Sequence, residues 1–154
     1  MGPLLFLIYV NDMRAAVNCK LLLYADDSAL IVSGKNVSEI ESSLEKELES
    51  LDRWLIDNKL SLHLGKTESI LFGTKRKIKE CKSMNISCNG RVIETKSEIT
   101  YLGLILDQSL TGKSIVSRIV SKCSGRLAFL YRKSEMLDLE SKRLLIFAFT
   151  QCHF

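Results

Sequence analysis

The stretch CKLLLYADDSALIVSG, Cys19–Gly34, decides how the fold of this 154-residue chain is interpreted. Its acidic pair, Asp26–Asp27, lies between two apolar runs. An Asp pair is common in turns, so the flanking residues carry the prediction. The runs Leu21–Tyr24 and Ala29–Ser33 predict two strands joined by Ala25–Ser28, with the acidic pair at the tip of a β-hairpin. Both runs are apolar on both faces, which is typical of covered central strands.

Adjacent carboxylates in such a place repel each other and are costly to desolvate. The predicted hairpin, Leu21–Ser33, contains no Arg or Lys that could neutralise them. A divalent cation can do so, and Mg²⁺ prefers hard oxygen ligands that it shares with substrate phosphates. The hairpin therefore indicates a Mg²⁺ site of the kind used in two-metal phosphoryl transfer.

Composition and charge are those of a globular protein with two unlike halves. Residues 1–74 contain 7 Lys/Arg and 11 Asp/Glu, a balance of −4, whereas residues 75–154 contain 15 and 7, a balance of +8. The asymmetry suggests an acidic working half and a basic half that meets a polyanion, and a solvated basic surface explains the charges equally well. Five cysteines without metal-ligand spacing indicate reduced thiols in an intracellular protein, nuclear or cytoplasmic.

The apolar segment near the start, GPLLFLIYV, is neither a signal peptide nor a membrane span. It lacks a basic leader and a small-residue cleavage site, and it is too short to cross a bilayer. We therefore expect a protein that is not secreted and has no membrane partner. Pro3 in the first turn and apolar residues on nearly every side predict a buried helix here.

The clearest helix is predicted from Ser38 to Asn58. Ser38 and Glu41 form a capping box, and apolar residues repeat at three- and four-residue steps: Val37, Ile40, Leu44, Leu48, Leu51 and Leu55. Downstream, LSLHL and ESILFG predict two short strands. The basic stretch TKRKIKECK, Thr74–Lys82, indicates a linker or exposed loop.

The remaining elements alternate in type. Asn89–Gly90 between MNISC and RVIE predicts a hairpin with a type I′ turn. ITYLGLILD follows as a buried strand. Two helices are then predicted, one over 115–133 with Ile119, Cys123, Leu127 and Leu130 on one face, and one from about Leu139.

Four motifs in order resemble the reverse transcriptases of non-LTR (LINE-type) retrotransposons. YADD, Tyr24–Asp27, matches the Y-x-D-D motif of that family, and GPLLFLIYVNDM resembles the segment that precedes it. LSLHLGKTESILFG resembles a downstream family segment, with His63 in place of the usual Asn. ITYLGLILD resembles the strand near the primer grip, and the basic helices after it resemble the thumb. The resemblance covers nearly the whole chain.

The resemblance implies an α+β fold: a partial polymerase palm, with a small antiparallel sheet and helices packed on it, followed by a helical thumb. Residues 1–74 would form the partial palm with the Y-A-D-D hairpin. Residues 75–112 would end the palm with a hairpin and a primer-grip-like strand, and residues 113–154 would form a truncated thumb.

The same resemblance assigns roles to residues. Asp26 and Asp27 would be two of three palm carboxylates that hold Mg²⁺, with Asp26 the main ligand, and Tyr24 would pack beside the primer end. Lys66 resembles the lysine that protonates pyrophosphate, and a plain surface lysine fits it equally well. Two further groups complete the expected site: Tyr101, Leu102 and Gly103 for primer positioning, where a core strand is an equal alternative, and Lys113, Arg118, Lys122 and Arg126 for nucleic-acid backbone contacts. Packing roles are expected for Trp54 and His63.

The implied function is an RNA-directed DNA polymerase that takes an RNA template, a DNA primer and dNTPs. The family's third carboxylate and its fingers lie upstream of the segment that begins here, so a fragment inactive by itself is expected. One alternative is a remnant that binds nucleic acid through its basic half without catalysis. A nucleotide cyclase is less well supported, because Tyr24 and Ala25 do not supply its Gly–Gly lead-in.

Overall fold

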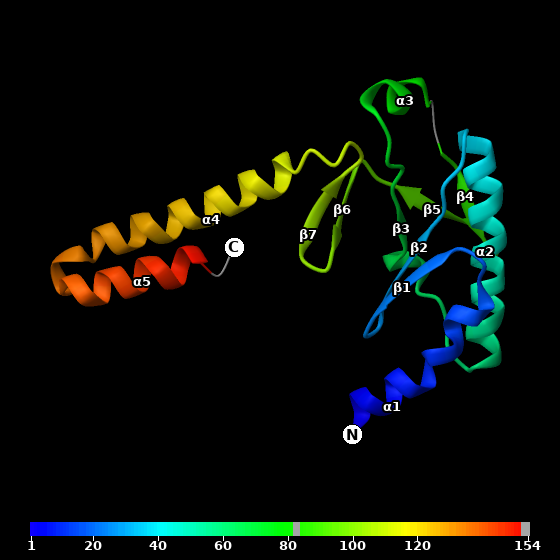
Figure 1. Cartoon of the computed structure of the whole chain (residues 1–154), viewed down its shortest axis with the longest axis horizontal. Helices are drawn as coiled ribbons and strands as arrows, with labels where there is room; N and C mark the ends of the chain where they lie inside the picture. Colours follow the sequence, from blue (N-terminus) through cyan, green and yellow to red (C-terminus); the bar gives the residue numbers. More distant parts are fainter. Residues whose placement is uncertain (82–83, 152–154) are drawn as a thin grey trace. The chain divides into compact units, whose positions relative to one another are not determined.

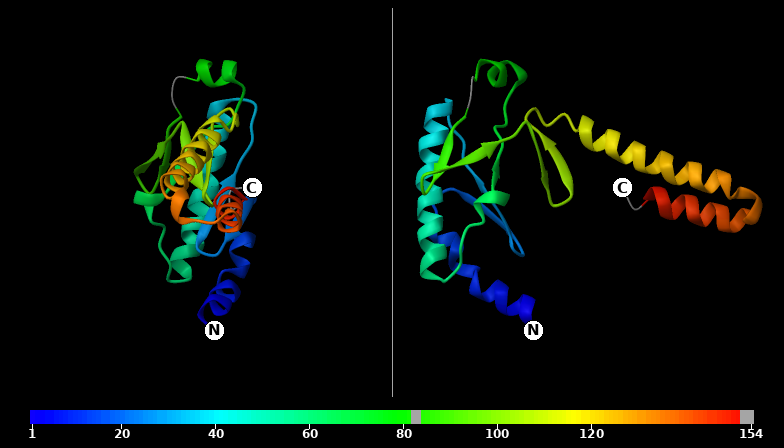
Figure 2. Two further views of the ribbon diagram at one scale, coloured as in Figure 1. Left: turned by 90° about the vertical axis from the view of Figure 1, so that its left-hand side faces the viewer. Right: turned by 180° about the vertical axis from the view of Figure 1, so that it is seen from behind.

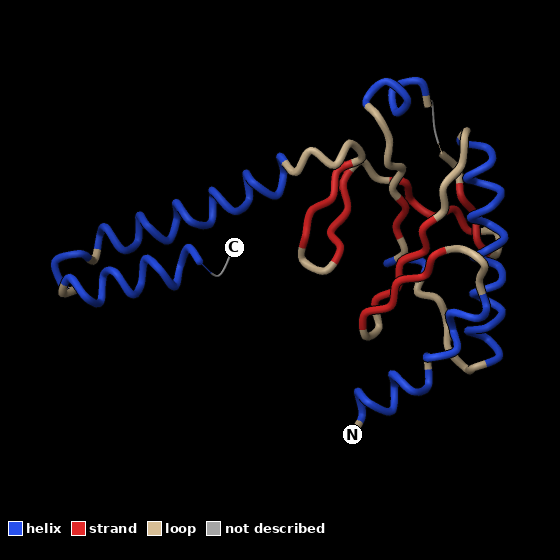
Figure 3. Tube along the Cα trace, in the orientation of Figure 1, coloured by secondary structure: helices blue, strands red, loops and turns tan. Residues whose placement is uncertain are grey.

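The computed structural model describes residues 1–81 and 84–151, as helices with small sheets, which confirms the α+β class (Figure 1). The chain divides into two compact units, residues 1–97 and 98–154. The described strands form three separate sheets and not the single antiparallel sheet that was predicted (Figure 3). No helix within the described ranges is both long enough and apolar enough to span a membrane.

The first unit contains two of the sheets and most of the buried core. Its elements in chain order are α1 (Gly2–Tyr9), the 3₁₀ turn η1 (Asn11–Ala16), β1 (Lys20–Tyr24), β2 (Asp27–Ile31), α2 (Val37–Asp57), η2 (Leu64–Lys66), β3 (Glu68–Ser69), α3 (Lys75–Glu80), β4 (Ile86–Cys88) and β5 (Arg91–Thr95). Strands β1 and β2 pair antiparallel. In the other sheet, ordered β3-β5-β4, β3 runs parallel to β5 and β4 runs antiparallel to it.

Helix α2 holds the first unit together. Its N-terminal half packs with β4 and β5 around Leu48, Ile86 and Ile93, and its C-terminal half packs Leu51 and Leu55 against η1 and β1. Figure 2 shows α2 lying alongside these strands. These two groups of buried side chains are the core clusters of the unit, and they confirm the predicted apolar face of α2. The packing role of Trp54 is also confirmed, since its ring is partly buried against the cluster that contains Leu51 and Leu55.

The cap of α2 differs from the predicted one. Asn36 is the N-cap, and its Oδ1 accepts a hydrogen bond from the Glu39 amide at 2.8 Å. Ser38 already lies inside the helix. Asn is as good an N-cap as Ser, and Asn36 lies three residues before Glu39, whose charge favours the first turn, so the N-cap lies two residues before the predicted one.

The acidic face of α2 binds neighbouring segments instead of facing only solvent. The Glu41 and Glu45 carboxylates accept the amides of Asn85 (2.7 Å) and Ser87 (2.9 Å) on the outer edge of β4. Asp52, 8% exposed, accepts the Asn89 side-chain amide at 2.7 Å. These bonds fasten β4 and its turn to the helix.

Several predicted elements of the first unit differ in the structure. Helix α1 is largely exposed: only Phe6 packs against the core, and four side chains are more than half exposed, namely Leu4, Leu5, Leu7 and Ile8. LSLHL forms no strand, because its alternating leucines pack into the two clusters without a neighbouring strand to pair with. The strand in ESILFG is limited to Glu68–Ser69.

The expected loop at Thr74–Lys82 contains helix α3. The Thr74 hydroxyl accepts the Lys77 amide at 3.4 Å and caps this short helix. Residues 82 and 83 lie outside the described residues. In the next hairpin the predicted type I′ turn is confirmed, since Asn89 (φ +52°) and Gly90 (φ +73°) are both left-handed.

The second unit is a hairpin followed by two helices. It comprises β6 (Glu98–Tyr101), β7 (Leu104–Asp107), α4 (Lys113–Arg132), η3 (Ser134–Met136) and α5 (Leu139–Gln151). The prediction of one buried strand over ITYLGLILD is wrong, because Leu102 (φ +48°) and Gly103 (φ +82°) form a turn that folds the segment into the antiparallel β6–β7 hairpin. Both predicted helices are confirmed.

The four cysteines described in the structure are free thiols: Cys19, Cys81, Cys88 and Cys123. Burial is the main cause that raises the pKa of Cys19, with a smaller contribution from Glu47. Burial likewise raises the pKa of Cys88, followed by the charges of Asp52 and Glu49. A raised pKa leaves less thiolate, so these two cysteines act as small apolar side chains. Cys152 lies outside the described residues.

Candidate functional site

The acidic pair lies where the β1–β2 hairpin turns. The strands pair without interruption from Lys20–Ile31 to Tyr24–Asp27, so the turn consists of Ala25 and Asp26 alone. Asp26 is therefore a turn residue, and Asp27 is the first residue of β2. Ala25 has a φ of +51°, a left-handed conformation that is uncommon for a residue with a side chain. The predicted hairpin with its acidic tip is confirmed, with a tighter turn than expected.

The environment of the pair differs from the expected one. Asp26 and Asp27 are exposed, and Tyr24 is 65% exposed. In the two strands only Leu21 is buried, because the two-stranded ribbon extends beyond the core and no described element covers its outer half. The prediction of covered strands around buried charges is therefore wrong: water hydrates both carboxylates.

The donor set at this turn meets part of what Mg²⁺ requires. Two adjacent carboxylates offer hard oxygen ligands, and within the described residues neither makes a side-chain hydrogen bond or an ion pair. The described residues contain no group of three or more His, Cys, Asp or Glu side chains that could hold a metal ion. The pair thus fits Mg²⁺ as part of a ligand set that water or phosphate oxygens would complete.

Lys66 and His63 lie in and beside η2. Lys66 is exposed, and its backbone amide donates to the carbonyl of His63 at 2.9 Å. No hydrogen bond or ion pair in the described part of the chain joins the Lys66 side chain to the acidic turn. His63 is exposed, so the expected packing role is wrong; the loop that replaced the predicted strand leaves its ring in solvent.

Tyr101, Leu102 and Gly103 lie together at the tip of the β6–β7 hairpin. Tyr101 is half-buried at the end of β6, and the side chain of Leu102 is 46% exposed in the turn. The core-strand alternative is excluded, because the chain reverses direction at Leu102 and Gly103.

Helix α4 presents the basic residues. It contains five Lys or Arg residues and no acidic residue. Lys113, Arg118 and Lys122 are exposed, whereas Arg126 is half-buried. The Arg126 Nη1 atom donates to the carbonyl of Phe149 in α5 at 3.0 Å, and its guanidinium lies 5.7 Å from the centre of the Phe149 ring. Arg126 thus helps to join α4 to α5, a role that composition alone does not reveal.

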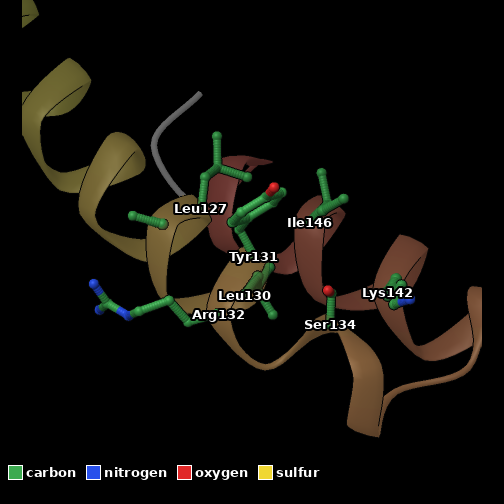
Figure 4. Close-up of a pocket in the computed structure, with 8 residues that line it drawn as sticks. Leu127, Leu130, Tyr131, Arg132, Ser134, Lys142 and Ile146 are labelled. Atoms are coloured by element: carbon green, nitrogen blue, oxygen red, sulfur yellow. The ribbon is translucent and has the colours of Figure 1, made fainter.

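Near the α4–α5 connection the two helices border an open apolar concavity of about 690 Å³. Leu127, Leu130, Tyr131 and Ile146 line it, with Arg132 and Lys142 nearby (Figure 4). None of the predicted site residues lies in it.

One residue of structural importance was missed in the sequence. The carboxylate of Asp107 accepts hydrogen bonds from Ser109, Thr111 and Gly112, which lie between β7 and α4. These bonds hold the pKa of Asp107 below its ordinary value, the Thr111 amide having the largest effect. An Asp followed closely by Ser, Thr and Gly is a recognisable turn signal, but here it lay at the end of an apolar run that indicated only a strand.

Comparison with known proteins shows to which family the chain belongs. The family described as "Reverse transcriptase (RNA-dependent DNA polymerase)" matches residues 1–106. The chain belongs to the reverse transcriptase family. Two relatives are polymerases of mobile elements. "RNA-directed DNA polymerase from mobile element jockey" of Drosophila funebris is 26% identical over 153 residues, 92% of this chain and 16% of that protein. "Probable RNA-directed DNA polymerase from transposon BS" of Drosophila melanogaster is 28% identical over 154 residues, 93% of this chain and 17% of that protein.

The expected resemblance to non-LTR retrotransposon reverse transcriptases is thereby confirmed. The chain spans about a sixth of the length of these relatives. No solved structure gives a significant match.

Proposed function

We propose that this chain forms palm and thumb parts of an RNA-directed DNA polymerase. Residues 1–74 and 75–112 would belong to the palm and 113–154 to a thumb. The observation that carries the proposal is the Y-A-D-D sequence folded as a tight hairpin turn, with both carboxylates exposed, in a chain of the reverse transcriptase family.

In this proposal the protein's own residues would bind the metal ion, orient the primer strand and protonate the departing pyrophosphate. Asp26, with Asp27, would hold Mg²⁺, which supplies charge neutralisation for the phosphates of an incoming dNTP. The exposed ring of Tyr24 would lie beside the primer end, and the hairpin tip at Tyr101, Leu102 and Gly103 would support the primer strand. Lys66 would deliver a proton to the departing pyrophosphate. The free thiols among the described residues fit an intracellular location, nuclear or cytoplasmic.

The chain tested alone should not polymerise. Two-metal transfer needs more carboxylate ligands than the two at this turn, and the described residues supply no third side chain to the group. A purified sample of the chain should therefore give no primer extension with Mg²⁺. Template-dependent extension that disappears in Asp26→Asn would show that two carboxylates are sufficient.

The metal site can be tested without activity. Mn²⁺ can replace Mg²⁺ as a paramagnetic probe, and water proton relaxation reports its binding. Asp26→Asn should weaken Mn²⁺ binding, and the matched control Asp57→Asn, which changes an exposed carboxylate in α2, should not. Equal binding by both variants would contradict the proposed site.

Nucleic-acid binding without catalysis is the second candidate function. The specific observation in its favour is α4, with its exposed Lys113, Arg118 and Lys122 and no acidic residue along the helix. Such a helix suits phosphate contacts, which give affinity without sequence choice. The relaxation experiment distinguishes the two candidates, since only the polymerase requires a metal at Asp26.

A further inference from the structure

A single carboxylate organises the loop between β7 and α4. Asp107 Oδ1 accepts the amides of Ser109 (3.0 Å) and Thr111 (3.1 Å). Its Oδ2 accepts the Thr111 hydroxyl (3.0 Å) and the Gly112 amide (3.0 Å). Four bonds to one side chain leave the connection few alternative conformations.

The backbone of this loop would be difficult to maintain without those bonds. Leu110 (φ +51°) and Gly112 (φ +68°) are both left-handed, a conformation that is unfavourable for a residue with a side chain such as Leu110. Gly112 is the N-cap of α4 and has no side chain with which to cap it. Asp107 instead holds the residue just before the helix by binding the Gly112 amide, and the Thr111 hydroxyl that it also binds accepts the Lys113 amide at 3.4 Å.

A second acidic residue ties α4 to the same end of the hairpin. The Ser114 hydroxyl, in the first turn of α4, donates to the carboxylate of Glu98 in β6. Glu98 and Asp107 are direct cross-strand partners. Two like charges side by side on a sheet destabilise it unless they are compensated, and the N-terminus of a helix, with its free amides, compensates negative charge.

We propose that Asp107, assisted by Glu98, is a positioning residue that locks α4 to the β6–β7 hairpin, so that the Leu102–Gly103 turn and the cations of α4 contact one RNA–DNA duplex as a rigid body. This inference rests on the proposed function. Two weak contact regions held in the right fixed geometry bind more tightly than the same regions joined by a loose linker, because the fixed geometry raises the effective concentration of the second contact and leaves less conformational freedom to be lost on binding.

The lock is tested first without nucleic acid. In Asp107→Ala, hydrogen exchange at the amides of Ser109, Thr111 and Gly112 should accelerate, while the rest of the unit keeps its protection. The matched control is Asp138→Ala, which removes another carboxylate that binds an amide at the start of a helix, that of Ser141 at 3.1 Å, away from the hairpin. Unchanged exchange in Asp107→Ala would overturn the lock.

Binding of a fluorescent RNA–DNA duplex, followed by anisotropy, tests its consequence. Asp107→Ala should lower the affinity about tenfold or more, and Asp138→Ala should leave it within about twofold. Leu102→Asn removes the apolar contact while keeping a residue that tolerates positive φ. It should weaken binding strongly in the natural chain and distinctly less in Asp107→Ala, a non-additivity that general loss of stability would not produce.

Asp107→Asn keeps one acceptor oxygen, so its affinity for the duplex should lie between those of the natural chain and Asp107→Ala. This variant keeps the test valid if the alanine variant does not fold. Additive effects of Leu102→Asn and Asp107→Ala would overturn the proposal. A natural chain that binds no duplex would overturn the nucleic-acid part of both proposals, whereas the exchange experiment would still decide whether Asp107 holds α4.

Discussion

At Ala25 the backbone of the acidic turn is strained. Its φ of +51° costs a non-glycine residue about 1–2 kcal/mol. A glycine would relieve this strain, but it gives up more conformational freedom on folding, which costs about 0.5–1 kcal/mol. Ala25→Gly should therefore stabilise the chain by about 0.5–1 kcal/mol in urea unfolding. Ala29→Gly, in the paired part of β2, should instead destabilise it by a similar amount. A destabilising effect of Ala25→Gly would contradict the assigned turn.

At Glu45 two bonds from Ser87 predict a dependence of stability on pH. The Ser87 amide and hydroxyl donate to its carboxylate at 2.9 and 2.8 Å, and they hold the pKa of Glu45 below its ordinary value of 4.5. A carboxyl group with a depressed folded-state pKa stabilises the fold above its unfolded-state pKa. That stabilisation is lost as the pH falls through the folded-state value.

The measurement is urea unfolding of the natural chain and of Glu45→Gln between about pH 7 and pH 3, which spans the loss of such a carboxylate's charge. The natural chain should lose more stability on acidification than the variant does. The matched control is Glu49→Gln, which alters an exposed acid of the same helix and should lose as much stability as the natural chain. Parallel curves for the natural chain and Glu45→Gln would show that Glu45 contributes nothing to the dependence.

Helix α2 is the element on which the first unit depends most. Leu48 is 6% exposed within the cluster formed with Met84, Ile86, Cys88 and Ile93. Leu48→Ala should cost about 2–5 kcal/mol, because it leaves a cavity between helix and sheet. Ile56→Ala, at a position of the same helix that is 59% exposed, should change the stability by only about 0.5 kcal/mol, as surface substitutions usually do. Comparable losses in both variants, measured in urea, would show that the apolar face is assigned incorrectly.

The sequence predicted those elements best whose signals are local, and it predicted burial least well. The periodicity of α2 and the Asn89–Gly90 turn are local signals, and both predictions are confirmed. The Leu102–Gly103 turn was missed because its first residue is apolar and continues the strand pattern on both sides. Burial was predicted least well: apolar residues in α1 and in the β1–β2 hairpin are exposed, since burial depends on which other elements cover them.

At the scale of the whole molecule, the uneven charge predicts how the chain responds to salt. Phosphate contacts release counterions, so the affinity for an RNA–DNA duplex should fall steeply as salt is added. Lys122→Ala should reduce the slope of log affinity against log salt by about 1. Lys46→Ala, which removes a cation from the acidic helix α2, should leave the slope unchanged. A slope that is the same in both variants would contradict an α4 interface.

The identity of the acidic turn could be predicted from the sequence because YADD and its neighbours are contiguous. The function of Asp107 could not, since it depends on four bonds to a loop whose conformation is visible only in the folded unit. The same limit applies to Arg126, whose basic character indicated a phosphate contact and whose bond to Phe149 joins two helices.

Glu41 and Glu45 of α2, which bind amides along β4, should also protect the chain against self-assembly. The outer amides of an edge strand are a template for a strand from another molecule, and Glu41 and Glu45 occupy those of Asn85 and Ser87. Protonated carboxyl groups are weaker acceptors, so acidic buffer should uncover this edge and let copies of the chain add to one another as fibrils. Thioflavin T fluorescence should then rise earlier in Glu41→Ala/Glu45→Ala than in the natural chain, and equal lag times would contradict this protective role.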